Sequence, residues 1–135
     1  MRKLIIKIFI LILCLNFIFG CRLAIEQRRK TIGSMPFEKQ KWKTSDKETD
    51  WKYRPKIARD LVNKKLLIGK SRAEIFEMLG ENNNHEWDSG KNIKYELEQI
   101  YGTNIDPIAI EYLVVTFDNE DKVEKTEIQF YKTGE

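Results

Sequence analysis

Few side chains in this sequence of 135 residues have the types and spacing that catalysis requires. His85 is the single histidine and stands beside Glu86 in an asparagine-rich loop, whereas a zinc site needs three or four clustered ligands. Glu96 and Glu98 alternate along one predicted strand and Glu124 lies on another, so a carboxylate pair for glycosidic hydrolysis is conceivable. Alternating acids on a strand more often form its solvated face. We therefore predict no catalytic residue, no metal and no cofactor.

Cys21 is different, because it directly follows an apolar leader. The basic residues Arg2, Lys3 and Lys7 lead into an apolar run from 8 to 15 that continues to Phe19, which is the layout of a secretory signal. A membrane-spanning helix needs about 20 apolar residues, and the stretch from 4 to 19 is shorter and contains a lysine. A cleaved signal is therefore favoured over an anchor helix.

The ending Gly20-Cys21 resembles the lipobox of bacterial lipoproteins, in which the cysteine sulfur is acylated and the cysteine begins the mature chain. The resemblance implies a signal peptide over 1–20, lipidation of Cys21 and attachment to a membrane. Arg22 stands where an aspartate would signal retention in the inner membrane, so the resemblance favours the periplasmic side of the outer membrane. An anchor helix and a cleaved signal without lipid stay open as alternatives.

Cleavage after residue 20 would change the charge balance of the chain. The formal net charge of +3 comes from the three basic residues of the leader, and without them 21 basic residues face 21 acidic ones. A balanced chain lacks the surplus of positive charge that general nucleic-acid binding requires, so we predict no nucleic-acid partner. No glycine-rich phosphate loop is visible either, and we identify no small-molecule substrate.

Residues 21–50 are polar and charged, and we predict that they form a tether of roughly 30 Å in span. Phe37 and Trp42 interrupt the polarity. Either they dock back onto the folded domain, or they bind a partner close to the membrane. We place the folded domain at 51–135.

Two helices are expected first in this domain. The earlier one begins near Pro55 and has apolar residues at helical spacing, namely Ile57, Ala58, Leu61, Val62 and Leu66. The later one begins with a capping box formed by Ser71 and Glu74, and Gly80 ends it.

The period then changes to two, which predicts three strands. Ile93, Tyr95 and Leu97 mark a half-buried strand, 108–117 is apolar on both faces as a central strand would be, and 123–131 returns after a hairpin loop. Short loops between strands favour antiparallel pairing. We predict an α+β fold in which two helices pack on a three-stranded antiparallel sheet, in the order α-α-β-β-β.

The segment from 67 to 80 resembles a conserved stretch of the outer-membrane assembly lipoprotein family BamE, also called SmpA/OmlA. The matching positions are Gly69, Ser71, Ile75, Leu79 and Gly80. The resemblance covers about residues 55–131. It implies the α-α-β-β-β fold shared with β-lactamase-inhibitor-like domains, and a role beside a protein partner in the envelope. Lys70 and Asn82 depart from the family pattern, and no partner-contacting residue is carried over.

A candidate partner surface follows from the alternation of the central strand. If Leu113 and its neighbours two residues apart face the helices, Tyr112 and Val114 face outwards, where Tyr131 or Tyr95 would join them. Such a patch suits protein binding, unless the tether covers it. We expect a non-enzymatic scaffold in outer-membrane protein assembly or envelope maintenance. An inhibitor-like binder of a periplasmic or foreign enzyme is the alternative, and a hydrolase comes third.

Overall fold

The computed structural model describes residues 32–43, 52–81, 90–102 and 105–133. The chain divides into two compact units, Met1–Gly33 and Ser34–Glu135, and the described helices and strands all belong to the second. The lipidation candidate Cys21 and the lone histidine His85 lie outside the described residues. Among the helices described, none has the length and apolar character needed to cross a membrane.

Three strands form one antiparallel sheet in the order β1-β2-β3. Their bounds are β1 Asn92–Tyr101, β2 Pro107–Phe117 and β3 Val123–Lys132. The prediction of an α+β fold with a three-stranded antiparallel meander is thus confirmed. β2 is the central strand, as its apolar sequence predicts, and Leu113 and Val115 are fully buried on the face that packs on the helices.

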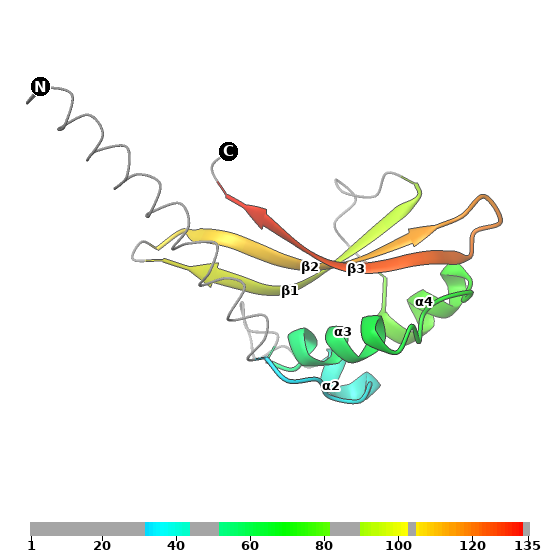
Figure 1. Ribbon diagram of the computed structural model, residues 1–135, viewed down its shortest axis with the longest axis horizontal. Coiled ribbons are helices and arrows are strands. Elements are labelled where there is room, and N and C mark those ends of the chain that lie inside the picture. Colours follow the sequence, from blue (N-terminus) through cyan, green and yellow to red (C-terminus); the bar gives the residue numbers. More distant parts are fainter. Residues whose placement is uncertain (1–31, 44–51, 82–89, 103–104, 134–135) are drawn as a thin grey trace, which may run out of the picture. The chain divides into compact units, whose positions relative to one another are not determined.

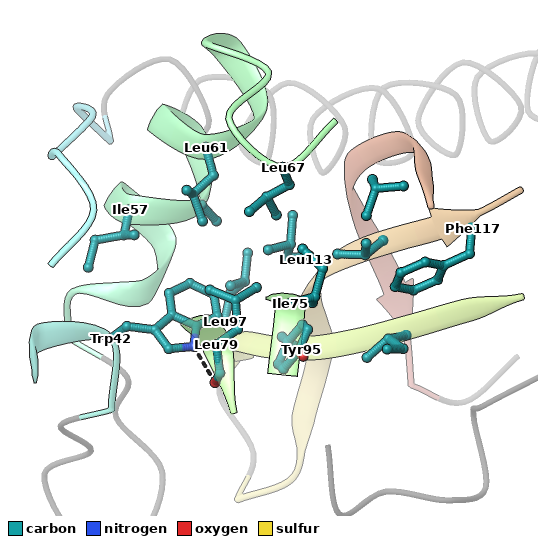
Figure 2. Packing of buried hydrophobic residues seen from close by; sticks show 14 residues of the cluster. Trp42, Ile57, Leu61, Leu67, Ile75, Leu79, Tyr95, Leu97, Leu113 and Phe117 are labelled. Carbon is teal, nitrogen blue, oxygen red and sulfur yellow. Dashed lines mark hydrogen bonds between the residues drawn. The ribbon is translucent and has the colours of Figure 1, made fainter. Parts of the chain in front are cut away.

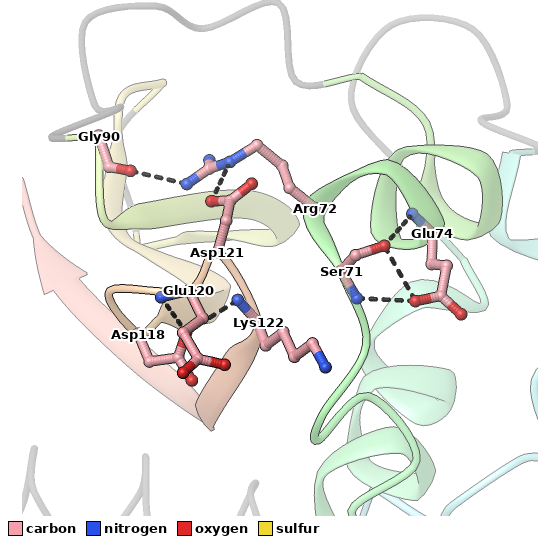
Figure 3. A network of polar contacts seen from close by, with 8 residues as sticks. All are labelled: Ser71, Arg72, Glu74, Gly90, Asp118, Glu120, Asp121 and Lys122. Carbon is pink, nitrogen blue, oxygen red and sulfur yellow. Dashed lines mark hydrogen bonds and ion pairs between the residues drawn. The ribbon is translucent and has the colours of Figure 1, made fainter.

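The described helices are α2 (Lys39–Lys43), α3 (Arg54–Asn63) and α4 (Arg72–Leu79), and they lie on one side of the sheet (Figure 1). α4 begins with the predicted capping box (Figure 3). The Ser71 side chain accepts a hydrogen bond from the backbone N–H of Glu74, and the Glu74 carboxylate accepts one from the backbone N–H of Ser71 at 2.8 Å. Gly80 ends the helix at φ +90°, a conformation that favours glycine.

A second contact at the start of α4 fixes this helix to the β2–β3 turn. Arg72 donates to the Asp121 carboxylate at 2.8 Å and to the carbonyl oxygen of Gly90 at 2.7 Å (Figure 3). Its guanidinium also lies 4.1 Å from the ring centroid of Phe117. One side chain therefore joins α4 to residues at the start of β1 and at the end of β2.

The prediction that Leu66 belongs to the apolar side of α3 was wrong, because the helix ends three residues before it. The helix stops at Asn63, and Lys65 adopts a left-handed φ of 54°. This turn leaves Leu66 42% exposed and directs the next residue, Leu67, into the core.

Trp42 is the largest side chain of the core and is fully buried, although its segment was assigned to the tether. Its indole N–H donates to the carbonyl oxygen of Leu79 at 3.0 Å, and its ring stands edge-on to Tyr95 (Figure 2). The Tyr95 hydroxyl donates to the carbonyl of Gly80 at 2.8 Å. Two aromatic side chains thus satisfy two of the carbonyl groups that the end of α4 leaves without helical partners.

The tether prediction therefore needs correction over residues 34–43. The compact unit begins at Ser34, and Met35 and Phe37 pack against the core beside Trp42. Of the two readings of Phe37 and Trp42, the structure shows the one in which they dock onto the domain. The physical reason is the area of the indole, since burying a large aromatic side chain outweighs the polarity of the residues around it.

A buried ion pair joins α3 to the central strand. Arg59 lies 2.8 Å from the Glu111 carboxylate, and both side chains are almost fully buried. Arg59 also donates to the carbonyl of Pro55 at 2.6 Å, so the guanidinium is held from two sides. A pair of this kind constrains geometry more than it adds stability, because desolvation offsets much of the attraction.

Candidate functional site

The sheet face that points away from α3 and α4 carries the residues predicted as a partner surface, and we call it the outer face. Strand register places four rows of side chains on it, each row crossing from β1 through β2 to β3. The rows are Asn92–Thr116–Lys125, Lys94–Val114–Glu127, Glu96–Tyr112–Gln129 and Gln99–Ile110–Tyr131.

Tyr112 and Tyr131, two of the residues predicted for this surface, lie together on the outer face. Their rings are 5.4 Å apart between centroids and meet edge to face. Lys94 reaches across from β1, donates to the Tyr131 hydroxyl at 2.7 Å and lies 4.3 Å from the centroid of the same ring. The three side chains come from three different strands, so the sheet itself sets their geometry.

The tyrosine pair continues into a line of hydrogen bonds along β3. The Tyr131 hydroxyl donates to the side-chain carbonyl of Gln129 at 2.6 Å, and the Gln129 amide donates to Glu127 at 2.6 Å. Lys125 completes the line with an ion pair to Glu127 at 3.0 Å. Each of these residues follows its neighbour at a spacing of two, which is the spacing of side chains on one face of a strand.

The pKa values of two side chains on the outer face differ from their ordinary values. Burial raises the pKa of Tyr112, and the nearby Glu96 and Tyr131 raise it further, so its hydroxyl stays protonated at neutral pH. The hydrogen bond from Lys125 lowers the pKa of Glu127, with a smaller contribution in the same direction from Gln129. The face therefore presents a neutral phenol beside a firmly ionised carboxylate.

Two expectations about this surface were wrong. Val114 points to the outer face but is only 3% exposed, and longer side chains, Lys94 and Glu127, occupy the positions opposite it on both neighbouring strands. Tyr95 lies on the opposite face, where it is buried against Trp42. The accessible part of the patch is therefore the tyrosine pair and its polar neighbours.

Glu96 and Glu98 of β1 do not follow the alternation of side chains that a regular strand would give. A shift in the β1–β2 register between Glu96 and Glu98 leaves Glu96 opposite Tyr112 on the outer face and Glu98 opposite the buried Glu111. A bulge of this kind changes which face the following residues occupy. The two acids consequently do not share a face, unlike the arrangement that simple alternation predicts.

The described residues contain no group of three or more histidine, cysteine, aspartate or glutamate side chains placed to hold a metal ion. What the outer face offers is a pair of aromatic rings with hydrogen-bond donors and acceptors beside them. Tyrosine is enriched at the centres of protein interfaces because it combines a large apolar area with a polar group. The arrangement suits binding of another protein.

Sequence reasoning missed Lys94, Gln129 and Glu127 as members of this surface. The period-two pattern of β3 was visible, but the partner strand and its register were needed to bring these residues beside Tyr131. Compared with known proteins, the chain matches no protein family, no curated protein and no solved structure.

Proposed function

We propose that this chain is a lipid-anchored bacterial envelope lipoprotein whose folded unit is a non-enzymatic binding module. The anchor is assigned to Cys21 because a basic and apolar leader ends in Gly20-Cys21. We further propose that α3, α4 and the three strands form the α-α-β-β-β arrangement of BamE-like and β-lactamase-inhibitor-like domains. The capped α4 between Gly69 and Gly80 and the antiparallel meander support this assignment.

The observation that carries the proposal is the tyrosine pair on the outer face. Tyr112 and Tyr131 meet on the outer face, and Figure 1 shows that α2, α3 and α4 all lie on the other side of the sheet. Lys94 holds Tyr131 in place from another strand, so the pair is ordered before any partner binds. Ordering in advance lowers the entropic cost of association.

The partner is a protein of the envelope, and the module acts as a scaffold in outer-membrane protein assembly or in envelope maintenance. Arg22 after Cys21 favours the outer membrane and its periplasmic side. On the outer face Lys125 and Glu127 form an ion pair, so these two charges balance each other locally. Apolar contact and hydrogen bonding, rather than net charge, would then give the affinity.

Crosslinking in cells followed by affinity capture of the tagged chain tests this function. Four forms are compared: the natural sequence, Cys21→Ser, the double variant Tyr112→Ala with Tyr131→Ala, and Glu77→Ala as a control on the exposed side of α4. We expect the natural sequence and Glu77→Ala to recover the same outer-membrane components. The tyrosine variant should lose them, because aromatic residues central to an interface contribute about 2 kcal/mol or more each.

The outcomes separate the candidate functions. Unchanged capture by the tyrosine variant, with its fold verified by circular dichroism, would remove the outer face as the partner surface. Equal capture by the natural sequence and by Cys21→Ser would show that partner binding does not require attachment through Cys21. Recovery of a soluble periplasmic enzyme in a 1:1 complex would replace the scaffold with the inhibitor-like binder.

A further inference from the structure

The loop that joins β1 to β2 carries an apolar surface that the core does not use. Ile105 is 95% exposed, Tyr101 47% and Ile108 49%, and we call these three residues the hairpin tip. They lie where β1 ends and β2 begins, since Tyr101 pairs with Pro107. The tip is at the far end of the sheet from the β2–β3 turn, so it is separate from the contacts of α4 (Figure 1).

Within the part of the chain that the structure describes, these side chains are not packed into the core. An isoleucine in water forgoes the favourable transfer free energy that burial of its side chain would provide. Ile108 packs locally over Gly102, where an added Cβ would lie 3.1 Å from its side chain, but Ile105 contributes to no part of the core. Exposed apolar groups gathered at one place mark contact with a protein or with a membrane.

The path of the chain indicates which of these contacts applies. The backbone N–H of Met35 donates to the carbonyl of Lys56 in the first turn of α3, and Arg54 in the same turn donates to the carbonyl of Glu96 on β1. Beyond the other end of α3, the backbone N–H of Gly69 donates to the carbonyl of Val123 at the start of β3. The folded unit therefore begins in the half of the domain that carries the hairpin tip (Figure 1).

The length of chain before the folded unit fits a contact with the membrane. Thirteen residues lead from Cys21 to Ser34, and a chain of that length extends to at most about 45 Å. From Glu96, where Arg54 is bound, to Tyr101 is five residues of strand, or about 17 Å. A chain anchored at Cys21 is thus long enough for the tip to reach the membrane surface. It also keeps the folded unit within a few nanometres of that surface.

We propose that the hairpin tip inserts Ile105 and Ile108 into the lipid bilayer that holds the amino-terminal anchor, an inference that rests on the membrane attachment of the proposed function. Tyr101, whose hydroxyl donates to Gln99 at 2.7 Å, lies at the headgroup level, where tyrosine is favoured. The exposed Asp106 and Lys132 near the tip oppose each other in charge, so the contact is apolar and salt changes it little.

Quenching by brominated lipid tests the insertion. The full chain is reconstituted into vesicles of phosphatidylethanolamine and phosphatidylglycerol with brominated acyl chains, and carries either Ile105→Trp or, as a matched control, Asn119→Trp in the exposed β2–β3 turn. We expect the added fluorescence at 105 to be quenched, at low and at high salt alike, and that at 119 to be unchanged. Adding Ile108→Ser to Ile105→Trp should lower the ratio of inserted to free tip about three- to tenfold. This is the fold-change expected from the transfer of half an isoleucine side chain into lipid, because Ile108 is 49% exposed.

The possible results distinguish insertion of the hairpin tip from the alternatives. If the chain floats with the vesicles but residue 105 is quenched no more than residue 119, the insertion is refuted while the anchor stands. If the chain does not float at all, both the anchor and the insertion fail. If a photo-crosslinking residue at 105 joins a protein rather than lipid in cells, the tip is a protein-binding site and the bilayer is excluded as its occupant.

Discussion

Replacement of Trp42 tests whether residues 34–43 belong to the folded unit. The indole is fully buried, and its loss in Trp42→Ala should lower the free energy of unfolding by about 3–5 kcal/mol. Trp42→Phe keeps most of the apolar area but removes the N–H that the carbonyl of Leu79 accepts. Leaving that buried carbonyl unpaired adds about 1–3 kcal/mol of destabilisation, so the phenylalanine variant should fall between alanine and the natural sequence.

The expected loss is large compared with the total stability of the unit. A domain of this size has a free energy of unfolding of about 5–15 kcal/mol, so Trp42→Ala would remove a large part of it. Urea unfolding followed by circular dichroism, on the soluble chain without residues 1–21, gives the free energies from the midpoints. Lys39→Ala, an exposed change on the same short helix, is the matched control and should leave the midpoint within error.

The reasoning would be refuted if Trp42→Ala unfolded at the same urea concentration as Lys39→Ala. Residues 34–43 would then contribute nothing to the fold, and the sequence-based assignment of a tether up to residue 50 would be restored. An intermediate value for Trp42→Phe is equally informative, because a phenylalanine variant as stable as the natural chain would show that the hydrogen bond to Leu79 adds nothing.

Three further predictions concern groups inside the unit. Glu111→Gln leaves Arg59 buried without its counter-charge and should destabilise by about 3–5 kcal/mol, whereas the double change Arg59→Met with Glu111→Leu should cost less. The hydrogen bond from the Ser71 N–H lowers the pKa of Glu74 below 4.5, so the stability it contributes is complete above pH 4.5 and is lost as pH falls through the folded pKa. Gly80→Ala forces a side chain into a φ of +90° and should cost about 1–3 kcal/mol. Urea titration measures all three, the second over a pH series.

Matched variants separate these effects from general damage. Glu38→Gln breaks an exposed ion pair to Lys41 and should change little, so an equal loss there would remove the argument from burial. Glu74→Gln should flatten the acid dependence below pH 4.5, and an unchanged pH profile would contradict the role of the capping box. Gly33→Ala, at a glycine without positive φ, should be neutral.

Local signals predicted the elements well, because their causes lie within a few residues. The capping box of α4 needs only Ser71 and Glu74, three positions apart, and both of its hydrogen bonds form. The central position of β2 follows from its long and nearly continuous apolar run, which is typical of a strand with a neighbour on each side. Such features depend on spacing along the chain, which a sequence displays directly.

Features set by distant pairing could not be predicted in this way. The hydrogen-bond partner of Trp42 is 37 residues away, and nothing in the polar segment around the tryptophan identifies it. The register shift after Glu96 moves Glu98 to the other face, and regular alternation of apolar residues up to Leu97 does not by itself indicate this shift. The candidate surface was half predicted for the same reason: the two tyrosines follow from alternation, but Lys94 reaches Tyr131 only through the pairing of three strands.

The burial of Trp42 has a consequence for the proposed anchoring at Cys21. With a domain beginning at residue 51, thirty residues would separate the lipid from the fold, and such a chain extends to at most about 100 Å. With the fold beginning at Ser34, the limit falls to about 45 Å, which is comparable to the dimensions of the unit itself. A partner bound at the outer face must then also lie near the bilayer, so a membrane-embedded or membrane-bound protein can meet Tyr112 and Tyr131 where a partner far from the membrane cannot.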